Sequence, residues 1–87
     1  MKSNNLVSII MTCYNGEYLL DKAVKSIINQ TYSNWELIFY NNFSNDRSLE
    51  IVESFQEPRI KYFTSDKLLN LGQVRKKAIE ACNGEYI

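Results

Sequence analysis

The feature that most constrains the fold is a short apolar run, residues 7–11, that changes abruptly to polar residues at Thr12. The run is rich in β-branched side chains, which favours a strand buried on both faces, as in a parallel sheet. Asn15 and Gly16 then signal a turn, and apolar residues at helical spacing begin after Glu17. Such a strand, loop and helix are the first half of a β-α-β unit, so ligand-binding groups are expected at the carboxyl end of the strand.

The rest of the chain repeats this alternation of buried strands and amphipathic helices. The elements are expected, in chain order, as a helix at 17–30, a strand at 35–40, a helix at 46–56, a strand at 60–63, a helix at 72–83 and a fourth strand that begins at 85–87. The pattern predicts a doubly wound α/β fold, with a mostly parallel sheet of about four strands and three helices. A length of 87 residues allows a single domain.

The composition excludes several classes of protein. Ten basic and ten acidic residues cancel, which leaves no electrostatic footprint for nucleic acid. No stretch approaches the roughly 18–20 apolar residues of a membrane span. Histidine is absent, and Cys13 and Cys82 lack the spacing of a metal site, so both are expected as free thiols. Because no signal-peptide core precedes the first strand, a cytoplasmic location is expected.

Polar side chains gather where the predicted strands end, at 12–15, 41–46 and 64–73. In a parallel sheet these clusters lie along one edge and can converge on one ligand. Each cluster also has a plainer explanation: a turn for the first, loop hydrogen bonds and a helix cap for the second, and a surface helix around Arg75 for the third. Glycine motifs for dinucleotides or a P-loop are absent. Carboxylates are sparse at these ends, so no metal site built wholly from this chain is expected.

Six segments of the chain occur in an order that is specific to one family. They are Val7-Ser-Ile-Ile-Met-Thr-Cys-Tyr-Asn-Gly-Glu, Ser26-Ile-Ile-Asn-Gln-Thr-Tyr-Ser-Asn-Trp-Glu-Leu-Ile, Asn41-Asn-Phe-Ser-Asn-Asp-Arg-Ser-Leu-Glu-Ile, Pro58-Arg-Ile-Lys-Tyr, Asn70-Leu-Gly-Gln-Val-Arg and Gly84-Glu-Tyr-Ile. Together they resemble the amino-terminal part of the family 2 glycosyltransferases. The resemblance implies that residues 1–87 are a single partial domain of the three-layer, Rossmann-like GT-A fold, which binds a nucleotide-sugar donor such as a UDP-sugar.

The resemblance assigns roles to four residues. Thr12 and Tyr14 match positions that lie against the base, and the phenol ring of Tyr14 is suited to stacking on uracil. Asn42 matches the second acid of the family's Asp-Asp-x-Ser segment, which hydrogen-bonds the base. Arg75 matches an arginine near the donor and its phosphates. Four neighbouring residues are further candidates for the same site: Asn15, Glu17, Asn41 and Asp46.

The resemblance also implies an inverting, metal-dependent transfer of a glycosyl group, in the synthesis of a bacterial cell-surface polysaccharide at the inner face of the membrane. In the family, a metal-binding Asp-x-Asp motif follows the segment that begins at Gly84, and this chain stops before it. The divalent cation, Mg or Mn, and the catalytic residues are therefore expected in a longer protein. Without the electrostatic help of the cation, the fragment alone is expected to be inactive.

Two departures from the family pattern leave an alternative open: the metal motif is missing, and Asn41 and Asn42 stand where the family has two acids. An amide can accept from the N3–H of uracil and donate to a carbonyl, but it supplies no charge. A non-catalytic α/β module for interaction or regulation is therefore the alternative function. In addition, the strand predicted at 85–87 would pair beside the first strand. A chain that stops there exposes a sheet edge, so either marginal stability or self-association through that edge is expected.

Overall fold

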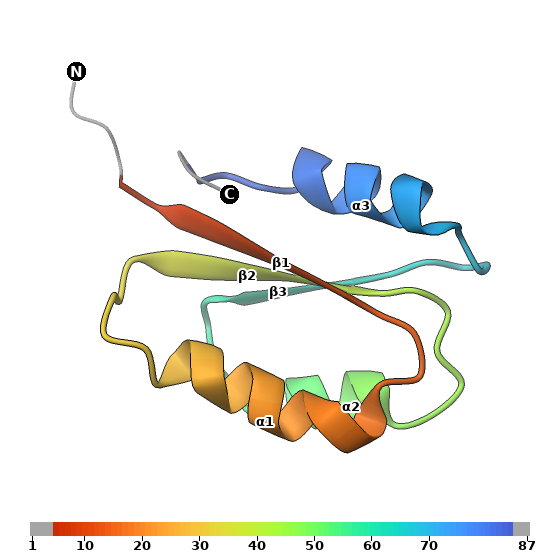
Figure 1. Cartoon of the computed structure of the whole chain (residues 1–87), viewed down its shortest axis with the longest axis horizontal. Coiled ribbons are helices and arrows are strands. Elements are labelled where there is room, and N and C mark those ends of the chain that lie inside the picture. The colour runs from red at the N-terminus through yellow and green to blue at the C-terminus, as the bar shows by residue number, and fades with distance from the viewer. Residues whose placement is uncertain (1–4, 85–87) are drawn as a thin grey trace.

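The computed structural model describes residues 5–84, in which strands alternate with helices (Figure 1). The elements are β1 (Val7–Cys13), α1 (Glu17–Ile28), β2 (Trp35–Asn41), α2 (Ser48–Glu53), β3 (Ile60–Thr64) and α3 (Leu71–Glu80). This order confirms the predicted α/β class and the three helices. The sheet of the described residues has three strands rather than four, because the strand predicted at 85–87 lies outside them.

The three strands are parallel and lie in the order β1-β2-β3. Cys13 is the register partner of Asn41, which is in turn the partner of Thr64. The carboxyl ends of the strands therefore form one row, which is the edge where ligands gather in such sheets. Strand β1 runs past its predicted end at Met11, since it stays paired with β2 through Thr12 and Cys13.

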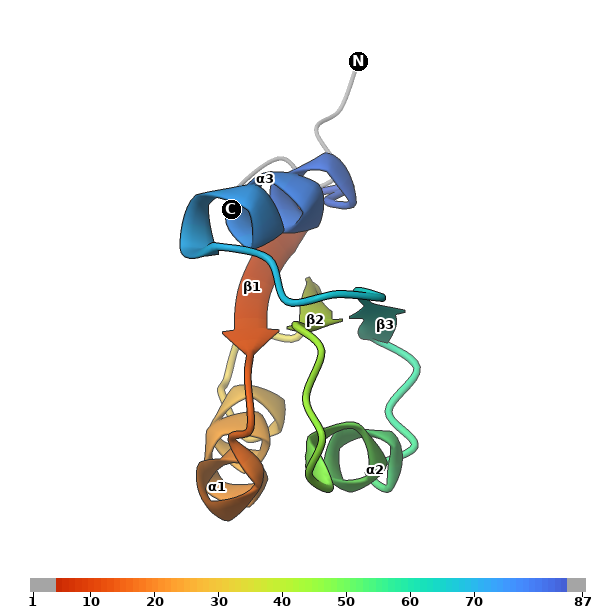
Figure 2. The ribbon, with the colours of Figure 1, turned by 90° about the vertical axis from the view of Figure 1, so that its right-hand side faces the viewer.

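The main core lies between the sheet and helices α1 and α2, which cover one of its faces (Figure 2). Trp35, Leu37 and Phe39 alternate along β2 toward this face and are almost completely buried. They pack in one cluster with Val24 of α1 and Val52 of α2, neither of which is exposed to solvent. The apolar stripe on each helix thus closes a continuous layer against the sheet.

Helix α3 covers the opposite face of the sheet (Figure 2), where it buries Val74 and Ala78. A capping box closes its first turn. Asn70 Oδ1 accepts from the Gln73 N–H at 2.8 Å, and Gln73 Oε1 accepts from the Asn70 N–H at 3.0 Å. The cap starts the helix at Leu71, one residue before the predicted start. It also fixes where the first turn meets the sheet.

A buried polar network holds the segment after α3 against the sheet. The Glu36 carboxylate accepts from Ser8 Oγ and from the Asn83 N–H, both at 2.6 Å. Burial raises the pKa of Glu36, but the hydrogen bonds from Ser8 and Asn83 outweigh it and leave the pKa below its ordinary value. The Gly84 N–H donates to Ser8 Oγ at 2.8 Å. A Cβ at Gly84 would lie 2.5 Å from that oxygen and 2.7 Å from the Leu6 carbonyl, so the close approach requires glycine.

The helices are shorter than predicted, and side-chain contacts explain part of the difference. Helices α1 and α3 end at Ile28 and Glu80, before the predicted ends. Helix α2 starts at Ser48, after a turn in which Asp46, its predicted first residue, accepts from the Ser48 N–H at 2.9 Å. It ends before Gln56, whose left-handed φ of 50° cannot continue a helix. None of the helices in residues 5–84 is long and apolar enough to cross a membrane.

Candidate functional site

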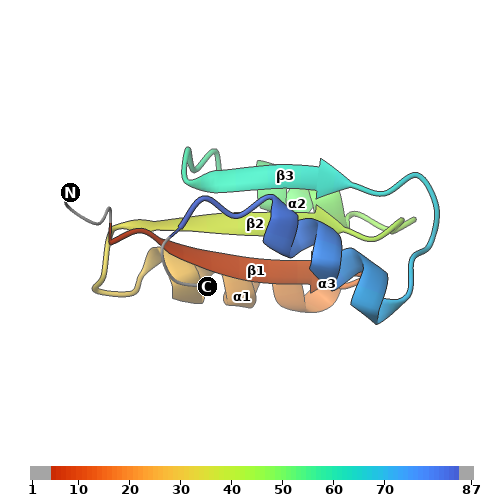
Figure 3. The same ribbon diagram turned by 90° about the horizontal axis from the view of Figure 1, so that it is seen from above.

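A pocket of about 230 Å³ lies where β1 and β2 end and α3 begins. Six residues line it: Thr12, Cys13, Tyr14, Asn42, Leu71 and Val74. Figure 3 shows the start of α3 beside the carboxyl end of β1. The structure therefore brings Thr12, Tyr14 and Asn42, which the sequence analysis grouped, to one pocket, and the first turn of α3 supplies the facing wall.

Thr12 and Tyr14 give the pocket two kinds of contact. Thr12 is half-buried near the end of β1, and its hydroxyl can both donate to and accept from a ligand. Tyr14 follows β1 directly and is 54% exposed. An exposed aromatic ring at a pocket is suited to stacking on a planar ring. Because Leu71 and Val74 are apolar, the pocket combines an aromatic ring, a hydroxyl and an apolar wall.

Asn42 is buried, and its side chain makes three hydrogen bonds. Its Nδ2 donates to the Leu69 carbonyl at 2.9 Å, while its Oδ1 accepts from the Leu69 N–H at 2.9 Å and from Ser65 Oγ at 3.2 Å. The backbone N–H of Asn42 donates to the Cys13 carbonyl at 2.7 Å. Asn42 therefore joins the end of β1, the end of β2 and the loop that leads into α3.

Asn15 and Asn41 hold loops together and are not among the residues that line the pocket. Asn41 Oδ1 accepts from the Ser44 N–H at 3.2 Å. Asn15 has a left-handed φ of 50°. Its N–H donates to Ser44 Oγ, and its Oδ1 accepts from the Asn45 N–H, both at 2.9 Å. The plainer explanations from the sequence, a turn and loop hydrogen bonds, therefore account for both residues.

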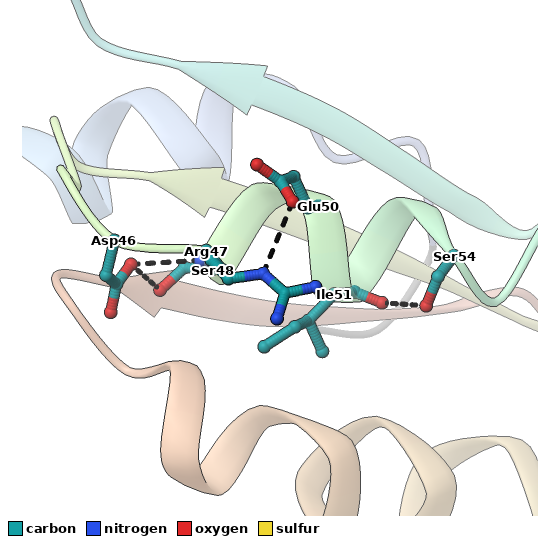
Figure 4. A network of polar contacts seen from close by, with 6 residues as sticks. All are labelled: Asp46, Arg47, Ser48, Glu50, Ile51 and Ser54. Atoms are coloured by element: carbon teal, nitrogen blue, oxygen red, sulfur yellow. Dashed lines mark hydrogen bonds and ion pairs between the residues drawn. The ribbon is translucent and has the colours of Figure 1, made fainter.

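The Asp46 carboxylate accepts from the first backbone N–H of two helices, α1 and α2. Its Oδ1 accepts from the Ser48 N–H and hydroxyl at 2.9 and 2.5 Å (Figure 4). Its Oδ2 accepts from the N–H of Glu17, the first residue of α1, at 3.2 Å. Burial raises the pKa of Asp46, but these hydrogen bonds outweigh it and hold the pKa below its ordinary value. Figure 4 also shows the ion pair of Arg47 and Glu50, which is exposed and therefore contributes little to stability.

Arg75 is exposed on α3 and does not line the pocket, although its neighbour Val74 does. Leu71 and Val74 are not among the site residues predicted from the sequence. The signal that could have found them is the capping pair of Asn70 and Gln73, because it sets the first residue of the helix and so the residues of its first turn.

Two larger hollows, of about 380 and 340 Å³, adjoin Leu69. Lys67, Leu69 and Lys77 line both of them. The smaller one also contacts Tyr40, whose ring stacks on Phe63 with the ring centroids 5.7 Å apart. Residues of the polar cluster predicted at 64–73 line these hollows, whereas none of the eight individually predicted site residues does. The hollows share no lining residue with the pocket at the ends of β1 and β2.

The sequence matches the family model described as glycosyl transferase family 2 over residues 8–87. The chain belongs to this family. It is 38% identical to the putative colanic acid biosynthesis glycosyl transferase WcaA of Escherichia coli K12, over the whole chain and 32% of that protein. It is 35% identical to the UDP-Glc:alpha-D-GlcNAc-diphosphoundecaprenol beta-1,3-glucosyltransferase WfgD of Escherichia coli, over 94% of the chain and 32% of that protein. It is 33% identical to the putative glycosyltransferase EpsE of Bacillus subtilis, again over the whole chain and 32% of that protein.

The chain thus spans about a third of the length of these family 2 relatives. Within residues 5–84, no group of three or more histidine, cysteine, aspartate or glutamate side chains could hold a metal ion. Cys13 and Cys82 are free thiols, as the sequence predicted. Burial raises the pKa of Cys82, so this thiol stays protonated near neutral pH. The described part of the family 2 fold therefore offers a pocket but no ready set of metal ligands.

Proposed function

We propose that this chain is the nucleotide-binding part of a glycosyltransferase, which transfers a glycosyl group from a UDP-sugar to an acceptor. The observation that carries the proposal is the pocket at the carboxyl ends of β1 and β2, in a chain of family 2. Ligands gather at this edge in open α/β sheets. The name of one relative states a UDP-Glc donor, which supports a uridine nucleotide as the first ligand to test.

Three residues would make the main contacts with the nucleotide. The ring of Tyr14 would stack on the base, and the hydroxyl of Thr12 would hydrogen-bond to its edge. Arg75 would extend from α3 toward the diphosphate, since a guanidinium can donate to two phosphate oxygens at once. Because these contacts are few, we expect weak binding. A dissociation constant in the millimolar range corresponds to a binding free energy of about −4 kcal/mol.

We infer that the transfer inverts the anomeric centre and uses a divalent cation, Mg or Mn, as the family resemblance implies. The cation would offset the charge that develops on the leaving diphosphate. Residues 5–84 present no suitable set of ligands, so the cation and the catalytic base would come from other residues. The chain alone is therefore expected to bind the nucleotide without transferring a sugar.

The names of the relatives support a role in the synthesis of bacterial polysaccharides. WcaA is named for colanic acid biosynthesis, and WfgD for glucosyl transfer to alpha-D-GlcNAc-diphosphoundecaprenol. By extension, we propose that the whole protein builds a cell-surface polysaccharide at the cytoplasmic face of the membrane.

Titration of UDP into the ¹⁵N-labelled chain tests the proposed function. We expect the backbone amides of Thr12, Tyr14 and Val74 to shift, because these residues line the pocket. The amide of Trp35 serves as the internal control, since it lies at the opposite end of the sheet and should keep its position. No shift at the pocket in millimolar UDP would contradict the proposal.

A non-catalytic module for interaction or regulation is the second candidate. The observation that favours it is the pair of amides, Asn41 and Asn42, at positions where the family resemblance places acids. An amide supplies no charge, so a chain that has lost nucleotide recognition could keep both residues for their loop contacts. The same titration separates the two functions, because the module predicts no shifts at the pocket.

A further inference from the structure

The side chain of Asn42 pairs with the backbone of Leu69 as a neighbouring strand would. Its Nδ2 donates to the Leu69 carbonyl and its Oδ1 accepts from the Leu69 N–H, both at 2.9 Å. This exchange of two hydrogen bonds is the pattern of a bridge between strands. It also fixes the orientation of the amide, because the flipped side chain would set oxygen against oxygen and N–H against N–H.

The hydrogen-bonding capacity of this amide is almost fully used inside the protein. Oδ1 accepts from Ser65 Oγ in addition to the Leu69 N–H, because the shorter of the two contacts of this hydroxyl is to Asn42 Oδ1, at 3.2 Å, against 3.5 Å to the Asn41 carbonyl. An amide oxygen has two lone pairs and an amide nitrogen two hydrogens. Both lone pairs of Asn42 are therefore occupied, and one Nδ2–H is left. Asn42 can offer the pocket a donor, but no acceptor for the N3–H of a uracil.

The pairing of Asn42 with Leu69 also determines the position of the pocket wall that Leu71 and Val74 form. Leu69 precedes Asn70, the residue that caps α3, and the first turns of α3 carry Leu71 and Val74 into the pocket. On its other side, Asn42 donates from its backbone N–H to the Cys13 carbonyl at 2.7 Å. Three elements of the pocket therefore meet at this one residue.

We propose that Asn42 is a positioning residue of the nucleotide site: it holds α3 against the ends of β1 and β2 and does not accept a hydrogen bond from the base. The inference rests on the proposed function and assigns Asn42 a role other than reading the base. An aspartate at this position could not donate to the Leu69 carbonyl. It would instead bring two acceptor oxygens together, so amide and acid are not equivalent here.

The two roles of Asn42 predict opposite effects of Asn42→Asp on the affinity for UDP. If Asn42 positions the wall, the variant weakens UDP binding by about tenfold and speeds hydrogen exchange at the Leu69 amide, because the pair with Leu69 is broken. If Asn42 reads the base through an acceptor, the acid binds UDP as well as the amide or better. The inference is overturned if Asn42→Asp keeps or strengthens UDP binding.

Two further comparisons complete the test. Ser65→Ala is the matched control, since it removes one hydrogen bond to Oδ1 but keeps both bonds to Leu69. It should bind UDP within about threefold of the wild type. Asn42→Ala should weaken UDP and CDP by the same factor, because a misplaced wall affects every base. A tenfold change in the ratio of the two affinities would overturn the positioning role.

Hydrogen exchange in the wild-type chain tests the inference even if the Asn42 variants fail to fold. With UDP bound, the Leu69 amide should exchange as slowly as in the free chain or more slowly. Faster exchange would mean that Oδ1 leaves Leu69 for the base, which overturns the inference. If UDP does not bind the wild type at all, the proposed function fails and the inference fails with it.

Discussion

Ligand binding and folding stability are expected to depend on different residues of this chain. Tyr14 is 54% exposed beside the pocket, so its ring is available to a ligand and contributes little to the packed core. Gly84 is the opposite case, because it lies so close to Ser8 that no side chain fits. Substitution of Tyr14 should therefore change only the affinity for the ligand, whereas substitution of Gly84 should change the free energy of unfolding.

Tyr14→Ala should weaken UDP binding about 5- to 150-fold, since stacking of a base on an aromatic residue is worth about 1–3 kcal/mol. The free energy of unfolding should change by no more than about 0.5 kcal/mol, as for other exposed positions. Tyr14→Phe is the control, because it keeps the ring and loses only the hydroxyl. Equal UDP affinities of Tyr14→Ala and the wild type in an NMR titration would show that the ring does not stack on the base.

Gly84→Ala should destabilise the chain by about 1–3 kcal/mol, because the new Cβ would crowd the backbone of Leu6 and Ser8. Gly72→Ala is the matched control. Its Cβ would meet only Asn70 Oδ1, at an ordinary 3.5 Å, and alanine in a helix is favoured over glycine by about 1 kcal/mol. Urea unfolding measures both changes. Equal effects of the two substitutions would contradict the packing described for Gly84.

At the scale of elements, the type and order of helices and strands could be predicted from the sequence, because they depend on the spacing of nearby apolar residues. The contacts that hold these elements together could not. Asp46 accepts from the Glu17 N–H, 29 residues away along the chain. The bonds between Asn42 and Leu69 likewise span 27 residues. Such contacts exist only once the fold has formed, so no pattern among neighbouring residues of the sequence predicts them.

Glu36 links β1, β2 and the segment after α3, and its pKa gives a prediction for acid stability. Because this pKa is below its ordinary value of 4.5 in the folded chain, the unfolded chain binds more protons between the two values. The contribution of Glu36 to stability is therefore complete above pH 4.5 and is lost as the pH falls through the folded-state pKa.

Glu36→Gln should destabilise the chain by about 1–3 kcal/mol near neutral pH, because only one side-chain oxygen stays an acceptor: with that oxygen toward Ser8 Oγ and the Asn83 N–H, the new amide nitrogen faces Asn83 Nδ2, and the two neutral bonds that remain lose the charge of the carboxylate. It should also make the loss of stability below pH 4.5 shallower. Part of that loss should remain, because the pKa values of Asp46 and Glu57 are lowered as well. Urea unfolding at a series of pH values measures this. An acid slope equal to that of the wild type would contradict the role of Glu36.

At the scale of the whole molecule, the position of the site could be predicted, because all parallel strands of the sheet end along one edge. Thr12, Tyr14 and Asn42 accordingly line one pocket. What the sequence could not predict is which polar groups stay free for a ligand. Asn42 is one of the six residues that line the pocket, yet Leu69 and Ser65 occupy the oxygen of its amide.

The sheet also leads to a prediction about association. Within residues 5–84, β1 and β3 are the outer strands of the sheet (Figure 2), and each pairs on one side only, with β2. Unpaired strand edges are templates for pairing with another chain. We propose that the chain self-associates through such an edge, so its average mass in sedimentation should rise with concentration. A constant monomer mass at all concentrations would contradict this.

Nuclear Overhauser contacts between the uracil protons of UDP and the side chains of the chain would show directly where the base binds. We predict contacts to the ring of Tyr14 and the methyl groups of Val74, which line the pocket at the ends of β1 and β2. Contacts instead to Lys67 and Lys77, which line the separate hollows beside Leu69, would contradict it.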